Sequence, residues 1–368
     1  MKTLLFLIPS LATRGAERVL INLVNSLDKS EYRITVQTLF DVGELRGSLT
    51  PEVEYRPGLP FLLRGYVQLM KFFSPKRLYR LIVKKKYDVA IAYLEGSATR
   101  IISGCPYSDS KKVAWVHIDQ SDMQDLSYCF RSEQETLTCY ARLDRVVAVS
   151  DVIRQQIEAR LSCRCDLLYN VIDTDRVLQL SQSAASDLPF TTSVNVISIG
   201  SLMPVKGYDR LIRVHQRLVA AGAAHHLYLI GTGPQASALH RQVQELHVTD
   251  TVHLLGFRSN PYPYLTQSDL YVCSSHNEGF STAIVEAMTL GLPVLSTHCS
   301  GAEELLGKDS EYGVVVDNTE QALFDGLYHI LTTPGILQHY AQRSQTSIMR
   351  YRKEQTLQQY HDFFHRLT

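Results

Sequence analysis

Short apolar runs alternate along the chain with stretches in which apolar residues recur at helical spacing. Such runs are typical of buried strands in a parallel sheet, because both faces of the sheet are covered. The first follows directly on the N-terminus, and the stretch after it predicts a helix on Val19, Leu20, Leu23, Val24 and Leu27. The pattern predicts strands at 4–8, 33–40, 88–93, 113–117, 145–149, 166–169, 194–199, 227–230, 252–254, 270–273, 294–296 and 314–316. Strands that alternate with helices predict βαβ units and a mostly parallel sheet.

The alternation lapses once, between residues 177 and 193, where the sequence is rich in Ser and contains Pro189. We therefore predict two doubly wound α/β domains, at 1–176 and 194–345, joined by a linker at 177–193. Residues 346–368 are predicted as a C-terminal helix, for which packing back on the first domain is one option. Ligands of such sheets bind at the carboxyl ends of the strands, which predicts a substrate cleft between the domains.

Composition narrows the class of protein. The 368 residues include 37 Lys and Arg and 37 Asp and Glu, and this balance argues against a dedicated nucleic-acid binder. Residues 1–176 hold 25 basic and 21 acidic groups, so the excess of base lies in the first half. Seven cysteines in a chain of this length do not form a disulfide framework, and Cys163 and Cys165 lack a second pair at zinc spacing.

The N-terminal apolar run has two interpretations. A short signal peptide is one, but Pro9 limits the run to the length of a buried strand. No run approaches the roughly 18 apolar residues of a membrane span. The sequence therefore favours a cytosolic protein.

Candidate chemistry concentrates in residues 274–288. Glu278 follows a strand, and Glu286 lies about one turn into the next helix. The amides of 279–283, at the start of that helix, could bind a diphosphate, and the carboxylates could bind a ribose and a further group. The alternative is that both are solvated residues at a helix start, where acids are favoured anyway.

Three other loops follow strands of the second domain. Lys206 lies in a turn between a strand and a helix, where it could clamp a phosphate, although the Walker pattern is absent. Gly231 belongs to a G-x-G that is weak on its own. Phe257 and Arg258, with Tyr262 and Tyr264 after them, could hold a flat base, or could simply pack or remain solvated.

Taken in order, RGAER, GSLMPVKG, GTGP, GF, EGFSTAIVE and SGAEEL resemble the retaining glycosyltransferases of family 4, which have the GT-B fold. The resemblance covers essentially the whole chain. It implies two Rossmann-like domains that face each other across a cleft. It also implies transfer of a hexose or N-acetylhexosamine from a nucleotide-sugar, most simply a UDP-sugar, to a saccharide acceptor.

The resemblance also implies roles for single residues. Glu286 would hold the nucleotide ribose, and Lys206 would neutralise the diphosphate. Glu278 would hold the donor sugar together with the amides of Gly279, Phe280 and Ser281. His117 matches a His beside the donor sugar, although such a residue is more often simply packed. The remaining donor-binding residues would be Gly15, Gly231, Phe257 and Arg258.

Two positions depart from the family pattern. Ser201 stands where the family usually carries Arg, so one expected diphosphate cation is missing. Arg14 replaces the first Gly of the usual G-G-A-E-R and could supply the lost charge. Both departures bear on how the diphosphate is held more than on the class of reaction.

The resemblance implies front-face attack assisted by the departing phosphate, with no cofactor and no metal. The single D-x-D, Asp173 to Asp175, is interpreted as a chance match. Two alternatives stay open. One is a nucleotide-sugar epimerase of the same shape, and the other is a partner subunit that binds nucleotide-sugar without turnover.

Residues 61–87 are unusually apolar and basic, and near their end they carry Lys84, Lys85 and Lys86. Such a segment suits the anionic inner face of a membrane. The alternative is that its apolar residues are core and its lysines a solvated helix end. Since family members of this type often extend polyprenyl-diphosphate-linked oligosaccharides for bacterial surface polysaccharides, we expect a cytoplasmic protein bound peripherally to the membrane.

Overall fold

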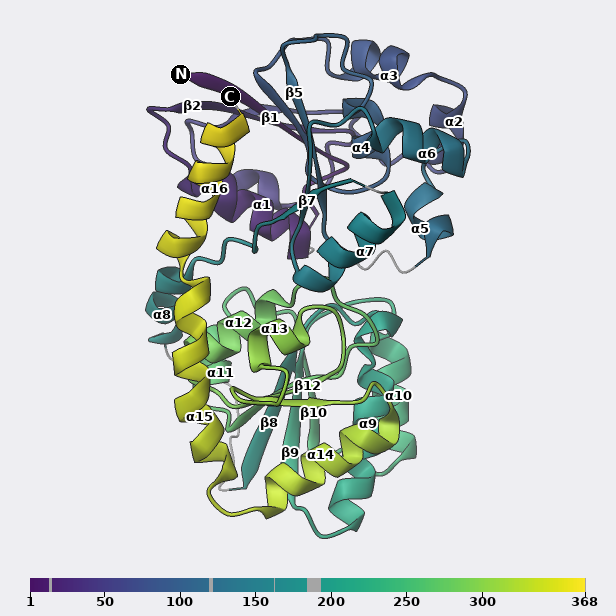
Figure 1. Cartoon of the computed structure of the whole chain (residues 1–368). Helices are drawn as coiled ribbons and strands as arrows, with labels where there is room; N and C mark the ends of the chain where they lie inside the picture. The colour runs from purple at the N-terminus through teal and green to yellow at the C-terminus, as the bar shows by residue number, and fades with distance from the viewer. Residues whose placement is uncertain (13–14, 119–121, 162, 184–192, 368) are drawn as a thin grey trace. The chain divides into compact units, whose positions relative to one another are not determined.

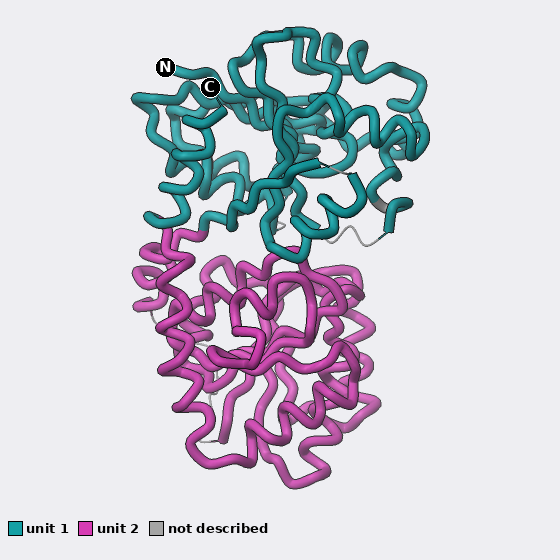
Figure 2. Tube along the Cα trace, viewed as in Figure 1, with its two compact units in different colours: residues 1–171, 354–368 teal, residues 172–353 magenta. Residues whose placement is uncertain are grey.

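The computed structural model describes residues 1–12, 15–118, 122–161, 163–183 and 193–367. The chain divides into two compact units (Figure 2). Unit 1 comprises Met1–Val171 and Glu354–Thr368, and unit 2 comprises Ile172–Lys353. Each unit is built around its own parallel sheet (Figure 1).

The described strands of unit 1 pair in the order β3-β2-β1-β4-β5-β6-β7, all in parallel. Their bounds are β1 (Lys2–Ile8), β2 (Tyr32–Thr38), β3 (Glu54–Arg56), β4 (Val89–Ala92), β5 (Lys111–Val116), β6 (Arg145–Ala148) and β7 (Cys165–Leu167). The chain adds strands outward from β1 to β3 and then returns to the other side of β1 with β4. The loops after β1 and β4 therefore flank the switch point, where ligands of open α/β sheets bind.

The helices of unit 1 are α1 (Gly15–Ser26), η1 (Leu45–Ser48), α2 (Tyr66–Lys71), α3 (Pro75–Ile82), α4 (Ser97–Ile102), α5 (Met123–Ser127), α6 (Glu133–Tyr140), α7 (Asp151–Leu161) and α16 (Lys353–Leu367). The last, α16, packs an aromatic face on the sheet, although it begins at Lys353 and the last strand of that sheet ends at Leu167. Trp115 of β5 stacks on Tyr360 with ring centroids 5.9 Å apart, and Phe364 meets Phe6 at 6.5 Å. These contacts, among residues spaced as one helix face, hold the C-terminal helix in unit 1.

The described strands of unit 2 also pair in parallel, in the order β10-β9-β8-β11-β12-β13. Their bounds are β8 (Val194–Ile199), β9 (His225–Ile230), β10 (Val252–Gly256), β11 (Leu270–Cys273), β12 (Val294–Thr297) and β13 (Val314–Val316). Here the order reverses between β8 and β11, so the loops after these two strands flank the switch point of unit 2.

Helices cover the sheet of unit 2 in two groups: α9 (Tyr208–Ala220), α10 (Ala236–Glu245) and α14 (Glu320–Thr332), and then α8 (Thr174–Ser181), α11 (Tyr262–Thr266), α12 (Thr282–Thr289), α13 (Ala302–Leu306) and α15 (Ile336–Ser347). Two short 3₁₀ turns are η2 (Pro204–Lys206) and η3 (Ile348–Tyr351). The first group shares one apolar core with the strands, in which Ile212, Leu239 and Leu327 are buried. Burial on both faces explains why the strands are almost continuously apolar.

The division of the chain differs from the predicted one in two respects. Residues 174–181, partly assigned to the linker, form α8 of unit 2, because the Asp173 carboxylate accepts a hydrogen bond from the Arg176 N–H at 3.2 Å and caps the helix. The C-terminal segment 346–368 is not one helix but the end of α15, η3 and α16. The rest of the predicted linker, 184–192, lies outside the described residues.

Two buried histidines in unit 2 interact with each other. His215 Nδ1 lies 2.9 Å from His225 Nε2, and His215 Nε2 lies 2.9 Å from Thr251 Oγ1. Burial, and then the neighbouring His225, lowers the pKa of His215 to about 2. The ring is therefore neutral in the folded protein at any ordinary pH.

We expect the unfolding free energy to fall as the pH drops below about 6.5, the pKa of an unfolded histidine, and His215→Asn to weaken this dependence. Between the two pKa values only the unfolded state binds the proton, so stability falls by about 1.4 kcal/mol per pH unit for such a histidine. Tm measured from neutral to mildly acid pH checks the slope, with the exposed His240→Gln as control. A slope unchanged by His215→Asn would contradict this assignment.

Candidate functional site

Lys206 and Glu278 meet at the switch point of unit 2. Lys206 ends η2 in the loop after β8, and Glu278 lies in the loop after β11, the neighbouring strand. Their side chains form an ion pair in which both are largely buried, and Ser275 Oγ donates a hydrogen bond to the same Glu278 Oε1 at 2.7 Å. Although desolvation opposes it, the Glu278 charge raises the pKa of Lys206 well above its usual range. The site therefore holds a fixed ammonium beside a fixed carboxylate.

A buried arginine fixes the loop that carries Glu278. Arg210 of α9 donates from Nη2 to the carbonyls of Ser274 at 2.6 Å and Ser275 at 2.9 Å. The Ser275 carbonyl also accepts from Thr297 Oγ1 at 2.6 Å. Because buried polar groups that are fully paired rigidify a structure, the carboxylate is positioned by the fold rather than by a flexible loop.

The two loops are also tied directly to each other. The His276 N–H donates to the Val205 carbonyl at 2.7 Å, and Ser274 Oγ donates to the Lys206 carbonyl at 2.9 Å. The ion pair is thus supported by main-chain and side-chain hydrogen bonds on both sides, which suits a preorganised electrostatic site.

Glu286 lies on α12, the helix that follows the Glu278 loop. Tyr262 of α11 donates its hydroxyl to Glu286 Oε1 at 3.2 Å. Ser281, the N-cap residue of α12, makes no side-chain hydrogen bond to the first turn, and that turn carries no acidic side chain, so its amides remain available for an anion. Gly279, Phe280 and Ser281, which precede this turn, are buried.

The glycine of the second loop has a structural explanation that needs no ligand. Gly231 follows β9 with φ +152°, and a Cβ placed on it would lie 1.9 Å from the Gly200 carbonyl oxygen. Any side chain at 231 would therefore force the loops after β8 and β9 apart. Its place among the predicted donor-binding residues stays a prediction.

The loop after β10 presents an aromatic and a cation. Phe257 is 52% exposed, whereas Arg258 Nε donates to the Tyr264 hydroxyl at 3.0 Å and its guanidinium lies 5.7 Å from the centre of the Tyr264 ring. The exposed Phe257 could stack on a base, while Arg258 is already engaged within the protein.

In unit 1, His117 directly follows β5 and is 6% exposed. Its ring forms a hydrogen bond to the Tyr93 backbone, while Nε2 has no hydrogen-bond partner within the described residues. Burial lowers the pKa of His117 to about 3, so the imidazole is neutral at pH 7. With the proton on Nδ1, Nε2 carries a lone pair that can accept a hydrogen bond from a hydroxyl.

Two sequence families match the chain in succession. The model for Glycosyltransferase Family 4 matches residues 13–176, and the model for Glycosyl transferases group 1 matches residues 183–347. The protein belongs to the group 1, family 4 glycosyltransferases. The predicted family is thereby confirmed.

Relatives of this glycosyltransferase extend over nearly the whole chain. A Campylobacter jejuni protein named N-acetylgalactosamine-N,N'-diacetylbacillosaminyl-diphospho-undecaprenol 4-alpha-N-acetylgalactosaminyltransferase is 26% identical, and the match covers 94% of each chain. An uncharacterized glycosyltransferase of Haemophilus influenzae is 23% identical, with 94% of each chain covered.

Solved structures confirm the predicted GT-B fold. The crystal structure of Anabaena HepE, in complex with UDP and glucose, matches with a TM-score of 0.77, 20% identity and 99% of each chain covered. Sucrose-phosphate synthase from Thermosynechococcus elongatus matches with a TM-score of 0.79, 17% identity, and 100% and 99% coverage of the two chains.

The sequence analysis missed a strand-end carboxylate of this glycosyltransferase. Glu95 follows β4 at the switch point of unit 1 and accepts a hydrogen bond from the His117 N–H at 2.9 Å. Desolvation raises the pKa of Glu95 to about 7. In the sequence, Glu95 could have been noticed as an acid followed by a glycine shortly after a predicted strand. Its position at the switch point, however, depends on the pairing of β4 with β1, which the sequence does not show.

Three further predicted site residues are Gly15, Ser201 and Arg14. Gly15 begins α1 after β1, and a Cβ there would meet no atom within 4 Å, so packing does not require a glycine. Ser201, which replaces the usual Arg, is exposed. Arg14 lies outside the described residues. Gly15, His117 and Glu95 belong to unit 1, as do the predicted membrane lysines, and the other described donor-site residues belong to unit 2.

Proposed function

We propose that this glycosyltransferase moves a hexose or N-acetylhexosamine, with retention of configuration, from a UDP-sugar to a lipid-linked saccharide in bacterial surface polysaccharide synthesis. The observation that carries the proposal is the Lys206–Glu278 pair at the switch point of unit 2, directly before the free amides of α12. A cation and a helix N-terminus suit a diphosphate, and a fixed carboxylate suits sugar hydroxyls.

In the proposed reaction the bond between the anomeric carbon of the sugar and the diphosphate oxygen breaks, and negative charge grows on the departing phosphate oxygen. The acceptor oxygen forms the new glycosidic bond to the same carbon, on the face from which the phosphate leaves. Lys206 and the first-turn amides of α12 stabilise that charge, Glu278 and Glu286 orient the donor, and the departing phosphate takes the proton of the acceptor hydroxyl. Since positioning and electrostatics suffice for such a reaction, the proposal needs no cofactor and no metal.

Lys206 already has a partner, so the diphosphate must compete with Glu278 for it. Ser201 leaves this site without the second cation that the family usually supplies. Arg14, the residue that the sequence suggests as a replacement, lies outside the described residues.

The acceptor side of the proposal rests on unit 1. The lone pair of His117 Nε2 and the Glu95 carboxyl lie at the ends of neighbouring strands, where they can bind sugar hydroxyls. The name of the Campylobacter jejuni relative describes transfer to a diphospho-undecaprenol-linked saccharide, which supports an acceptor of this class.

A thermal-shift panel of UDP, GDP and ADP tests the donor. We expect UDP to raise Tm most, because the nucleotide of the donor should bind the folded protein with the lowest Kd. A ligand at 100 times its Kd stabilises the folded state by about 2.7 kcal/mol. Stabilisation by GDP alone would overturn the UDP assignment. Release of UDP from the UDP-sugar only when an acceptor is added then separates a transferase from an epimerase or a subunit without turnover.

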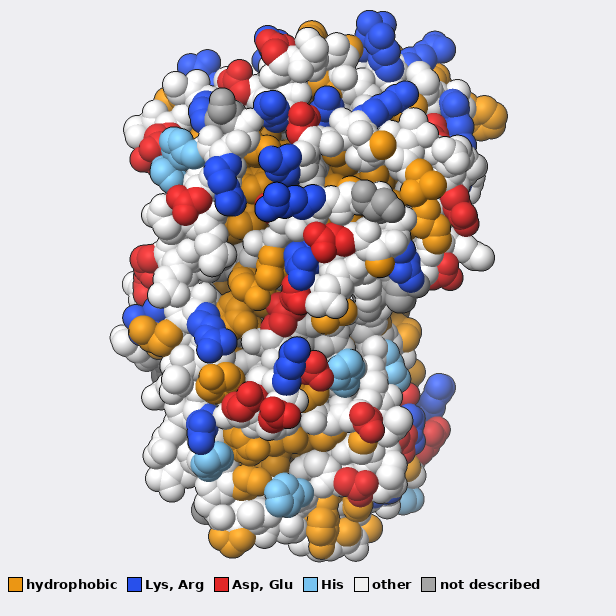
Figure 3. Space-filling model, viewed as in Figure 1, with side chains coloured by type: hydrophobic (Ala, Val, Ile, Leu, Met, Phe, Trp, Pro, Cys, Tyr) orange, Lys and Arg blue, Asp and Glu red, His pale blue; other side chains and the backbone are white. Residues whose placement is uncertain are grey.

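We further propose that the protein acts at the anionic inner face of the membrane. The described residues include no helix long and apolar enough to cross a bilayer. On the face drawn in Figure 3, Lys and Arg side chains are frequent over unit 1. Within residues 61–87 the exposed apolar side chains are Phe61, Leu62, Leu69, Phe72 and Leu81.

The structure divides this segment in a way that the sequence did not show. Ser74 caps α3 by accepting from the Arg77 N–H at 3.3 Å, so α2 and α3 are separate helices. Leu78 and Tyr79 of α3 are core, as the alternative interpretation held for the apolar residues, whereas Phe72 is 81% exposed. Of the three predicted membrane lysines, Lys86 pairs with Asp109 and Lys85 lies 4.0 Å from Glu54.

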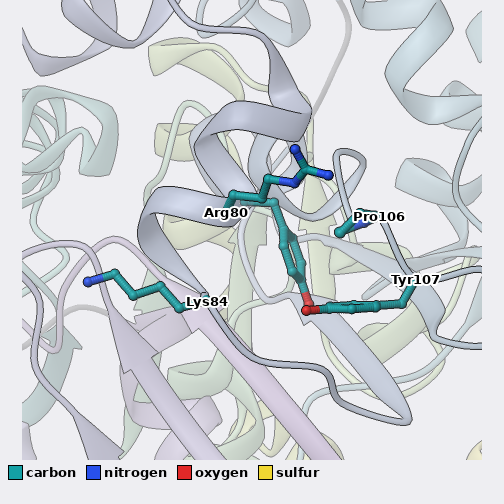
Figure 4. A pocket seen from close by; sticks show the side chains of 5 residues that line it. Arg80, Lys84, Pro106 and Tyr107 are labelled. Atoms are coloured by element: carbon teal, nitrogen blue, oxygen red, sulfur yellow. The ribbon is translucent and has the colours of Figure 1, made fainter.

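A pocket beside Lys84 does not add to the donor site. It has a volume of about 310 Å³ and is lined by Tyr79, Arg80, Lys84, Pro106 and Tyr107 (Figure 4). These residues precede β4 and β5, at the edge of the sheet opposite Glu95 and His117. In Figure 4 the Lys84 amine points away from Arg80 and Tyr107, so the cations do not converge on one anion.

A further inference from the structure

Three side chains that are distant in sequence converge at the amino end of β2. Glu31 directly precedes β2, and His361 and His365 lie one turn apart on α16. His361 Nε2 lies 3.3 Å from Glu31 Oε2, His365 Nε2 lies 3.2 Å from the same oxygen, and the two Nε2 atoms are 3.1 Å apart. All three belong to unit 1.

The triangle formed by these atoms has the dimensions of a metal site. Two ligands about 2.05 Å from one zinc ion at the tetrahedral angle are about 3.3 Å apart, and the three edges here are close to that value. Two imidazoles and a carboxylate are also a ligand set that zinc uses. In the described residues, this is the one group of three such side chains whose ligand atoms lie within 4.8 Å of one another.

Helix geometry accounts for the arrangement. Residues four apart on a helix lie on one face, so His361 and His365 point in the same direction. The adjacent face carries Tyr360, Phe363 and Phe364, whose packing on Trp115 and Phe6 sets the rotation of α16 and directs the histidines to Glu31. All three candidate ligands keep part of their side chains exposed, so an ion can reach them.

We propose that Glu31, His361 and His365 bind a Zn²⁺ ion that fastens the C-terminal helix α16 to the sheet of unit 1. The carboxylate and the two Nε2 atoms supply three ligands, and water supplies the fourth. The site lies at the amino ends of the strands, whereas Glu95 and His117 lie at the carboxyl ends, so the ion has a structural role and takes no part in sugar transfer. The proposal is independent of the proposed donor and acceptor.

The test uses the full chain without a polyhistidine tag, stripped with chelator and then titrated with ZnCl₂ under reducing conditions. We expect one zinc per chain by equilibrium dialysis and a rise in Tm of about 5 °C at saturating zinc. His361→Gln and His365→Gln should each abolish the shift, since glutamine keeps a polar side chain but loses the imidazole ligand.

His240→Gln, which removes an exposed histidine from α10, is the matched control and should keep the full shift. If zinc does not raise the Tm of the wild type, or if the shift persists in His365→Gln, the proposal is overturned. In the second case the metal would be assigned to other groups, such as the free thiols. Sugar transfer measured without added zinc should be the same in the wild type and both variants, so this result and the test of the proposed function cannot be confused.

Discussion

Replacing Lys206 with alanine should lower kcat/KM by about 10²–10³-fold, the usual cost of losing one preorganised group that stabilises transition-state charge. Glu278→Ala should have an effect of similar size, because the donor sugar then loses its fixed carboxylate. Both variants should keep the fold, since each side chain lies in a loop outside the hydrophobic core. Steady-state kinetics together with circular dichroism check this expectation.

The ion pair itself complicates the interpretation, because each single variant leaves a largely buried charge without its partner. Breaking such a pair is destabilising, and removing both partners costs less. The double variant should therefore recover part of the Tm lost in the singles without recovering activity. A purely structural pair would instead recover both together.

Nucleotide affinity separates the two roles further. Lys206→Ala should weaken UDP binding, whereas Glu278→Gln should keep or tighten it, because Lys206 loses the carboxylate that competes with the diphosphate. Arg213→Ala is the matched control: it breaks the ion pairs of Arg213 with Glu320 at 2.9 Å and Asp209 at 3.1 Å in the same unit. Near-normal turnover in Lys206→Ala or Glu278→Ala would contradict the assignment.

The strand pattern was the most predictable part of this protein. Strands buried on both faces must be apolar throughout, so runs such as 194–199 and 270–273 were found with their bounds unchanged. The exception is β3, three residues at the sheet edge with no apolar run, which the sequence did not predict. Short edge strands depend on pairing rather than on their own pattern.

The site was predictable where spacing along the chain carries the chemistry. Glu278 and Glu286 are separated by one loop and one helical turn, so their placement could be deduced locally. Lys206 was also found, but its pairing with Glu278 depends on β8 lying next to β11, which only the sheet order reveals. The same holds for Glu95, whose strand neighbours β1.

Helix caps and long-range clusters were missed for different reasons. Asp173 was interpreted as half of a chance D-x-D, although Asp is a preferred N-cap, so the helix that it starts was not recognised and residues 177–181 of α8 were assigned to the linker. His361 and His365 are visible as an i, i+4 pair, but Glu31 lies 330 residues before His361. No local pattern can join residues so far apart.

The turn between α2 and α3, which carries the exposed Phe72, is held by a buried arginine. Arg100, fully buried, donates to the carbonyls of Met70 at 2.7 Å and Phe73 at 2.8 Å, and also forms an ion pair with Glu135 at 3.1 Å. Arg100 thus holds the main chain on both sides of Phe72. In the proposed function, Phe72 belongs to the surface that contacts the membrane, together with the exposed Phe61, Leu62 and Leu69.

We therefore expect wild-type protein to sediment with anionic liposomes at low salt, and Leu62→Ser/Phe72→Ser to reduce the bound fraction strongly. Lys84, Lys85 and Lys86 together should contribute less than the roughly 1 kcal/mol per cation of free basic residues, because two of them have acidic neighbours. Their replacement by Gln should weaken binding about tenfold, which is about 1.4 kcal/mol.

Two controls separate these effects from general changes in the surface. Net charge is controlled by removing three exposed cations elsewhere in unit 1, Arg142, Arg145 and Arg164, and apolar exposure is controlled by Leu137→Ser. Transfer to a short soluble acceptor should hardly change in any of these variants. Wild-type protein that remains in the supernatant at low salt would end the membrane proposal and leave the donor chemistry at Lys206 and Glu278 untouched, since the two rest on different units.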